Sequence, residues 1–253
     1  MTEIGSGWEV RFTLDVPISE RSIKEIDGIK FETEVHSLGI ELKGFKIIIP
    51  ATNEADARIL AEGKANRIFD YLSWIHNRSI SGYFSGMTEI RPAGDVKRGI
   101  ASFSVSAIIH NPVDLDFSLI LDVLEGRDEK LLRQLGHYSL GLKAADIISK
   151  YREFYQVIED EQDVGGTPET KPLESIEDID VETIKRVIRN LLSHPVLSKN
   201  KTHVSIATTL LGRPYLDMSN VNDKKLIEVN LNAIKEEAQN ILIPKLKGIM
   251  VSD

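Results

Sequence analysis

The segment Trp8-Glu9-Val10-Arg11-Phe12-Thr13-Leu14-Asp15-Val16 alternates apolar and polar side chains without a break. A period of two is typical of a β-strand that buries one face, because successive side chains point to opposite sides of the strand. The stretches 29–36 and 38–49 repeat the alternation, and the second contains Gly44, where we expect a bulge or a tight turn. The chain is therefore predicted to open with a short antiparallel sheet.

A helical period follows Pro50. Small and apolar residues recur there at spacings of three and four, which indicates a helix that covers one face of the sheet; they are Ala57, Ala61, Ala65, Ile68, Leu72 and Ile75. Thr52 or Asn53 is suited to cap this helix, and the alternating stretches 79–91 and 99–110 are expected to add two strands. We predict an α+β domain over residues 1–112.

Beyond Pro112 the apolar residues keep a helical spacing, so residues 113–253 are predicted to form an all-α helical bundle. At least two helices are expected to end near Glu161. An acidic insert at about 162–179, with Gly165-Gly166 and two prolines, is expected to be flexible. A helix then begins after Asp180 and is stopped by Pro195, while 199–218 is expected to be an irregular connection.

The final helix is predicted to run from about Asn222 until Pro244 ends it. Its apolar residues have a heptad-like spacing, which favours a homodimer because a second copy would cover this face; they are Ile227, Leu231, Ile234, Ala238 and Ile241.

Composition excludes several classes of chemistry. The chain has 253 residues and 42% hydrophobic content, enough for a sizeable core, and it has no cysteine, which excludes disulfides, thiolate nucleophiles and iron–sulfur clusters. Its histidines lack metal-ligand spacing, and no phosphate-binding glycine motif is present, so we expect neither a metal nor a cofactor. No apolar run approaches the roughly 20 residues of a membrane span, and Met1–Ile4 has no basic start, so a cytoplasmic location without membrane contact is expected.

Charge is distributed unevenly along the chain. The net charge is −8, yet residues 153–182 carry eleven acids and one base, whereas residues 183–225 carry eight bases and two acids. A local excess of positive charge within an acidic protein can hold one phosphate chain at a defined place without binding nucleic acid indiscriminately.

The basic block contains Arg189-Asn190-Leu191-Leu192-Ser193-His194, followed by Pro195. A residue before proline is driven out of the α region, so we expect His194 to leave the helix and turn back toward Asn190 or Arg189. Arginine binds two oxygens of a phosphate, and histidine transfers protons near neutral pH. Arginine and histidine together indicate metal-independent phosphodiester chemistry.

This hexapeptide resembles the Arg-x(4 to 6)-His signature of the HEPN superfamily, the higher eukaryotes and prokaryotes nucleotide-binding proteins. The helix Tyr151–Glu159, the acidic insert, the motif helix and the closing helix are also similar to its Apea-like and methylamine-utilisation-associated branch, over roughly residues 115–245. The resemblance implies an all-α bundle that dimerises so that two Arg-His pairs face one cleft. In active members, RNA is cleaved there to a 2′,3′-cyclic phosphate.

Carried onto this chain, the resemblance implies that Arg189 orients phosphate, His194 acts as acid or base, and Asn190 positions the pair. Glu159 is a weaker candidate for orienting Arg189 across the bundle. Lys185 and Arg186, in the same basic helix, are candidate contacts for RNA.

Each residue also has a structural interpretation. His194 can simply interact with the end of the helix dipole, and Arg186 and Arg189 can belong to a solvated ion-pair face. Tyr151 and Tyr155 are more typical of a core than of a base-stacking surface. Two functions are expected as alternatives. One is an HEPN-type metal-independent endoribonuclease or RNA-binding protein that acts in defence or stress response, and the other is a noncatalytic dimeric interaction protein with a helical docking bundle.

Overall fold

The protein has a mixed α+β fold. The computed structural model describes residues 7–16, 25–26, 29–35, 41–90, 99–101, 128–162, 179–194 and 201–249. The chain divides into two compact units, Met1–Leu132 with Gly248–Asp253 and Arg133–Lys247, each of which is considered by itself. The predicted boundary at 112/113 and nearly all of the predicted acidic insert lie outside the described residues.

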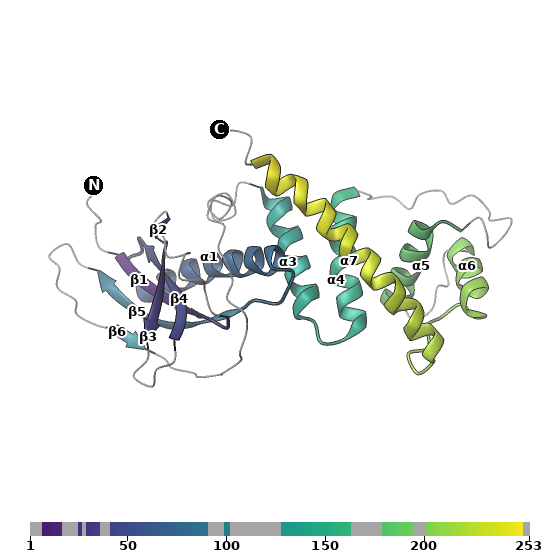
Figure 1. Cartoon of the computed structure of the whole chain (residues 1–253), viewed down its shortest axis with the longest axis horizontal. Coiled ribbons are helices and arrows are strands. Elements are labelled where there is room, and N and C mark those ends of the chain that lie inside the picture. Colours follow the sequence, from purple (N-terminus) through teal and green to yellow (C-terminus); the bar gives the residue numbers. More distant parts are fainter. Residues whose placement is uncertain are drawn as a thin grey trace. The chain divides into compact units, whose positions relative to one another are not determined.

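The first unit is built on an antiparallel sheet (Figure 1). Its strands are β1 (Gly7–Leu14), β2 (Glu25–Ile26), β3 (Ile29–Val35), β4 (Glu41–Ile49), β5 (Gly82–Ile90) and β6 (Gly99–Ala101), in the spatial order β2-β3-β4-β1-β5-β6. Each neighbouring pair is antiparallel. The predicted N-terminal antiparallel sheet is confirmed, although residues 102–110 of the last expected strand lie outside the described residues.

The alternation in β1 fixes which side of the sheet is the core. Val10, Phe12 and Leu14 are buried, whereas Arg11 between them is exposed. The ring of Phe12 stacks on Phe45 of β4 with centroids 5.5 Å apart and meets Phe69 edge-on at 6.4 Å. Each such buried aromatic side chain contributes roughly 1.5–3 kcal/mol, so the core forms on the Phe12 side.

Gly44 lies within a continuous strand, so the expected bulge or turn at this position is wrong. Gly44 pairs with Thr13 of β1 and Glu32 of β3 without a register shift, and the irregularity in the sheet falls instead between Arg11 and Phe12, opposite β5. A Cβ atom at residue 44 would lie 2.1 Å from the carbonyl oxygen of Phe12. Glycine is required here by the close approach of the two backbones, not by a turn.

Helix α1 (Glu54–Ile75) covers the core face of the sheet, as predicted. The side chain of Asn53 accepts a hydrogen bond from the Asp56 N–H at 2.9 Å, so Asn53 is the N-cap. Ala57, Ala61 and Ala65 are fully buried along one stripe of the helix. Small side chains at these positions let the helix approach the strands closely.

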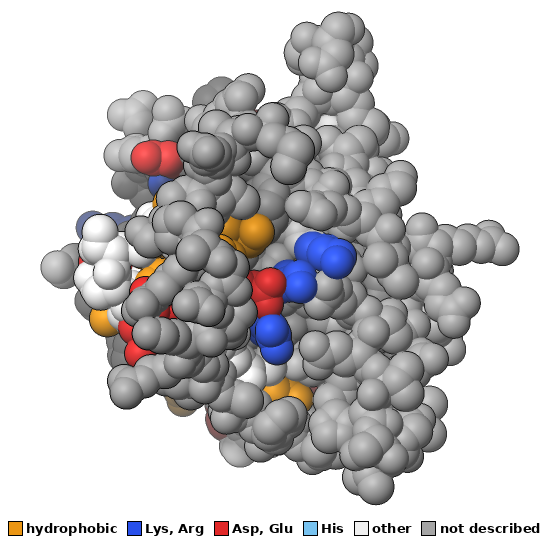
Figure 2. Space-filling model, turned by 90° about the vertical axis from the view of Figure 1, so that its left-hand side faces the viewer, with side chains coloured by type: hydrophobic (Ala, Val, Ile, Leu, Met, Phe, Trp, Pro, Cys, Tyr) orange, Lys and Arg blue, Asp and Glu red, His pale blue; other side chains and the backbone are white. Residues whose placement is uncertain are grey.

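The opposite face of the sheet carries charged side chains. Arg11 and Lys46 are directly opposite each other in neighbouring strands, and both pair with Glu9, at 2.9 and 3.2 Å. Figure 2, which views the molecule from the side at the left of Figure 1, shows Lys and Arg side chains gathered beside an acidic one. Because both signs are present, we interpret this face as a solvated surface of mixed charge.

The second unit is helical. Its helices are α3 (Glu129–Lys143), α4 (Ile147–Gln162), α5 (Val181–Ser193), α6 (Lys201–Leu211) and α7 (Val221–Ile249). The two helices expected before Glu161 are confirmed as α3 and α4. The second unit begins within α3, and no strand is found among its described residues.

Helix α6 occupies the stretch predicted to be an irregular connection, so that prediction is wrong. Ile206 and Ala207 are buried against Val187 and Leu191 of α5. The helical stripe is complete only if His203 is counted as a buried residue, because 203, 206, 207 and 210 then follow the i, i+3, i+4, i+7 spacing. The four threonine and serine residues of α6 have low helix propensity, so the helix is stabilised mainly by its packing on α5.

Helix α7 continues through Pro244, which we expected to end it. Leu242 and Leu246, on either side of the proline, are fully buried, whereas Pro244 is exposed. An interior proline costs a helix roughly 3 kcal/mol, and burial of the two flanking leucines offsets this cost.

The heptad-like face of α7 is covered by the chain itself. Ile227, Ile234 and Ala238 have no exposed surface in a single copy of the protein. Leu231 and Ile241 are half-buried. Most of this face is thus covered within one copy, so its spacing does not by itself require a second copy.

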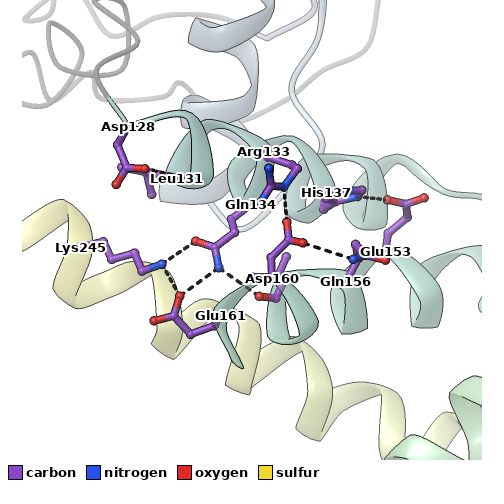
Figure 3. Close-up of polar contacts among 11 residues, drawn as sticks. Asp128, Leu131, Arg133, Gln134, His137, Glu153, Gln156, Asp160, Glu161 and Lys245 are labelled. Carbon is purple, nitrogen blue, oxygen red and sulfur yellow. Dashed lines mark hydrogen bonds and ion pairs between the residues drawn. The ribbon is translucent and has the colours of Figure 1, made fainter. Parts of the chain in front are cut away.

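Polar side chains join α3, α4 and α7 at one end of this unit (Figure 3). The buried side chain of Gln134 donates to the Val157 carbonyl oxygen at 3.1 Å and accepts from Lys245 Nζ at 2.6 Å. Lys245 also pairs with Glu161, which accepts from Gln134 at 3.2 Å. A buried amide with partners at both ends favours one arrangement of the three helices.

Candidate functional site

The candidate site lies toward the C-terminal end of α5. Asp180 caps the start of this helix, since its carboxylate accepts from the Thr183 N–H at 2.7 Å. At the other end, His194 has φ −130° and ψ 116°, and its N–H donates to the Asn190 carbonyl oxygen at 2.8 Å. The predicted exit of His194 from the helix is confirmed, and its cause is the proline that follows it.

Arg189 is held by a carboxylate of a neighbouring helix. Its Nη2 donates to Glu159 Oε2 of α4 at 2.8 Å, and its Nη1 donates to Asn190 Oδ1 at 3.3 Å. The side chains of Arg189 and Glu159 are 28% and 33% exposed. The expected contact between Glu159 and Arg189 is thus present, and it orients a guanidinium that solvent still reaches.

The structure does not join His194 to Arg189. His194 is exposed, and among residues 128–162, 179–194 and 201–249 its ring has no hydrogen bond or ion pair. Arg189 directs its guanidinium toward Glu159 and Asn190 instead. The exposed ring is accessible to a ligand, but within one chain nothing described orients it.

Asn190 contacts a different histidine. Its Nδ2 lies 3.0 Å from Nδ1 of His203 in α6, and His203 is only 2% exposed. Burial lowers the pKa of His203, and the charge of Arg186 lowers it further. His203 is therefore neutral at neutral pH, and the bond from Asn190 assigns its ring proton to Nε2.

The sequence does not single out His203. Its partner precedes it by 13 residues and lies on another helix, so no spacing within one element reveals the contact. The available signal was the helical stripe in α6, where His203 takes the place of an apolar residue.

Arg186 and two tyrosines form the next layer between α4 and α5. Tyr151 and Tyr155 are buried with parallel rings 6.4 Å apart, which places them in the core as expected. The Tyr151 hydroxyl donates to the Lys185 carbonyl oxygen at 3.0 Å, and burial raises its pKa. Burial also raises the pKa of Tyr155 and outweighs the hydrogen bond and charge of Arg186, which lower it.

Lys185 belongs to the packing of the helices. It is 5% exposed, and its Nζ lies 2.6 Å from Glu182 and 2.5 Å from Glu237 of α7. Desolvation alone would lower the pKa of Lys185, but the hydrogen bonds and charges of these two carboxylates raise it. An ammonium enclosed by two carboxylates is not presented to a phosphate, unlike the RNA contact expected of this residue.

The contacts form one polar chain, Glu159–Arg189–Asn190–His203, that crosses α4, α5 and α6. Chemically it offers an oriented guanidinium, which binds anions, and the exposed imidazole of His194 follows five residues later at the helix end. No group of three or more potential metal-ligating residues occurs within the part of the chain that the structure describes. In the same ranges, no helix is long and apolar enough to cross a membrane.

Comparison of the chain with protein-family models, with curated proteins and with solved structures yields no match.

Proposed function

We propose that the protein is an HEPN-like RNA-binding protein and that Arg189 and His194 form half of a metal-independent ribonuclease site. The observation that carries this proposal is the Glu159–Arg189 ion pair at 2.8 Å. A carboxylate that uses only part of a guanidinium leaves other N–H groups available for a phosphodiester, in a fixed orientation. His194 is exposed one turn further along, where a substrate could reach it.

The reaction requires two imidazoles, and one chain supplies one at this site. With two copies facing each other, His194 of one copy takes the proton of the 2′-hydroxyl, and the 2′-oxygen forms a bond to phosphorus. The bond from phosphorus to the 5′-oxygen breaks, and that oxygen takes a proton from His194 of the second copy. Arg189 stabilises the charge on the nonbridging oxygens. The product is a 2′,3′-cyclic phosphate.

The test of this function is cleavage of single-stranded RNA by two variants. We expect His194→Ala to abolish cleavage while changing the free energy of unfolding by no more than about 1 kcal/mol, because an exposed histidine at a helix end contributes little more. A chelator is expected to leave cleavage unchanged. Intact cleavage in His194→Ala, or full inhibition by the chelator, would contradict the proposed mechanism.

Arg189→Lys keeps the charge but removes the planar fork. We expect it to lower RNA affinity or cleavage roughly 10- to 150-fold, the equivalent of a charge-assisted contact of about 1.5–3 kcal/mol. The matched control is Arg152→Lys on the exposed face of α4. Arg186 is unsuitable as a control because it interacts with Tyr155. Equal RNA affinity and cleavage in the two variants would show that Arg189 acts only as one of several surface cations.

A noncatalytic interaction protein is the second candidate, and one observation favours it. Asn190, the residue expected to position the Arg-His pair, contacts buried His203 and not the ring of His194. A histidine with 2% exposure cannot exchange protons with RNA directly. Under this alternative, the parent protein does not cleave RNA, and neither His194→Ala nor Arg189→Lys changes its behaviour toward RNA. Arg189 and Asn190 then serve only to hold α4, α5 and α6 together.

A further inference from the structure

We propose that His203 is a positioning residue for Arg189 and acts on it through the side chain of Asn190. The inference rests on the proposed function for its consequence in RNA binding, but the positioning itself can be measured without RNA. It adds a residue from a third helix, α6, to a site otherwise built from α4 and α5.

The side-chain amide of Asn190 is used at both ends. Its Oδ1 accepts from Arg189 Nη1 at 3.3 Å, and its Nδ2 donates to His203 Nδ1 at 3.0 Å. A rotation of this amide by half a turn would exchange donor and acceptor and would oppose two donors at Arg189. The acceptor on His203 therefore keeps Oδ1 directed at the guanidinium.

His203 is a rigid anchor for this purpose. His203 is buried on α6, a helix that lies beside α5 (Figure 1). Ile206 and Ala207 of α6 are packed on α5. The neutral ring presents an unprotonated Nδ1, because burial and the charge of Arg186 disfavour its protonated form. The position of the acceptor is thus fixed by packing, as a positioning group requires.

The guanidinium is consequently held from two helices at once. Glu159 of α4 binds Nη2, and Asn190, fixed by His203 of α6, binds Nη1. With both terminal nitrogens engaged, the guanidinium plane cannot turn, and its remaining N–H groups are presented in one direction. Planar, bidentate recognition of a phosphodiester depends on that direction.

The experiment compares three variants with the parent protein. His203→Asn keeps an acceptor near the position of Nδ1, whereas His203→Leu removes it at similar volume. Val204→Ala is the control, since it loosens the packing of α6 without touching the acceptor. The readout is the ¹⁵N relaxation order parameter of the Arg189 Nε–H group, assigned by its loss in Arg189→Lys.

We expect a rigid Arg189 Nε–H in the parent, His203→Asn and Val204→Ala, and an order parameter below about 0.6 in His203→Leu. In RNA assays, His203→Leu should lower kcat/KM roughly tenfold and His203→Asn should restore it. No further loss should follow when His203→Leu is added to Arg189→Lys, because residues that act through one another are not additive.

An unchanged order parameter in His203→Leu would overturn the inference whether or not RNA is cleaved. If the parent protein neither binds nor cleaves RNA but Arg189 loosens in His203→Leu, the proposed function fails and the positioning role stands. If His203→Leu does not fold, His203→Gln replaces it, because its acceptor lies nearer the position of Nε2 and should also release Arg189. A rigid Arg189 in that variant would overturn the inference equally.

Discussion

The two histidines near the end of α5 have opposite environments. His194 is exposed to solvent, whereas His203 is enclosed between helices and accepts a hydrogen bond from Asn190. Their chemistry differs accordingly: a proton donor or acceptor for RNA must be reachable, and an anchor for another side chain must be rigid. Asn190 links the two: its carbonyl oxygen accepts from the His194 N–H, and its side chain donates to His203.

The buried histidine makes stability depend on pH. Because the pKa of His203 is lowered by burial and by Arg186, the unfolded chain binds the proton first as pH falls. We expect its contribution to be complete above about pH 6.5 and to be lost below it, by up to about 1.4 kcal/mol per pH unit until the folded protein is protonated as well.

Urea unfolding of the parent and of His203→Asn at pH 7.5 and 5.5 measures this dependence. The free energy of unfolding should fall more between pH 7.5 and 5.5 in the parent than in the variant. The carboxylates present in both proteins contribute equally, so the difference reports on His203. The same pH dependence in both proteins would show that His203 titrates alike in the folded and unfolded chain.

Lys185 provides a second prediction at the level of one side chain. Lys185→Met removes the cation between Glu182 and Glu237, and we expect the free energy of unfolding to fall by about 1–3 kcal/mol, because Glu237 loses its partner in the helix interface. The exposed Lys225→Met should change it by less than about 0.5 kcal/mol. A neutral Lys185→Met would mean that the two carboxylates are well solvated without it.

At the level of elements, two glycines in helices should respond oppositely to alanine. Gly63 in α1 has open space where a Cβ would lie, so Gly63→Ala should raise the free energy of unfolding by about 0.5–1 kcal/mol. In α3, a Cβ on Gly141 would lie 2.7 Å from the buried ring of Phe154, so Gly141→Ala should lower it by about 1–3 kcal/mol. Denaturant unfolding measures both changes. If Gly141→Ala raised the free energy of unfolding as Gly63→Ala does, the result would contradict the packing of α3 on α4.

Pro244 is the second feature of an element that can be tested. Pro244→Ala supplies an N–H where α7 lacks one, and we expect a gain of roughly 1–3 kcal/mol in unfolding free energy. Thermal and urea unfolding report this gain. A loss of stability would show instead that a bend at the proline is needed to bring Lys245 to Gln134 and Glu161.

Elements whose pattern is local were predictable, and those decided by packing were not. The alternation of β1, the Asn53 cap and the exit of His194 before proline all depend on neighbouring residues. Helix α6 and the continuation through Pro244 depend on burial against other helices, which local propensity does not contain. In the same way, Glu159 was a candidate partner for Arg189 from the sequence, but His203 required the α5–α6 contact.

At the scale of the whole molecule, we expect the protein to form a homodimer in solution, because the proposed two-histidine site needs two copies of the chain. We expect light scattering at micromolar concentration to give twice 28.3 kDa. The second copy must use surfaces other than the buried face of α7. A strict monomer would remove the two-histidine mechanism while leaving RNA binding by Arg189 open to its own test.

The strand order has a consequence for how the first unit forms. β1 precedes every other described strand, yet it lies at the centre of the sheet, and Trp8 pairs with Glu89 across most of the unit's sequence. Such distant pairing is slow to form, because the chain loses the entropy of closing a long loop before it gains the free energy of the contact. During synthesis, the edge of β1 that binds β5 therefore stays unpaired until residues 82–90 have left the ribosome. An unpaired strand edge can pair with another chain, so the nascent chain is most exposed to aggregation in this interval.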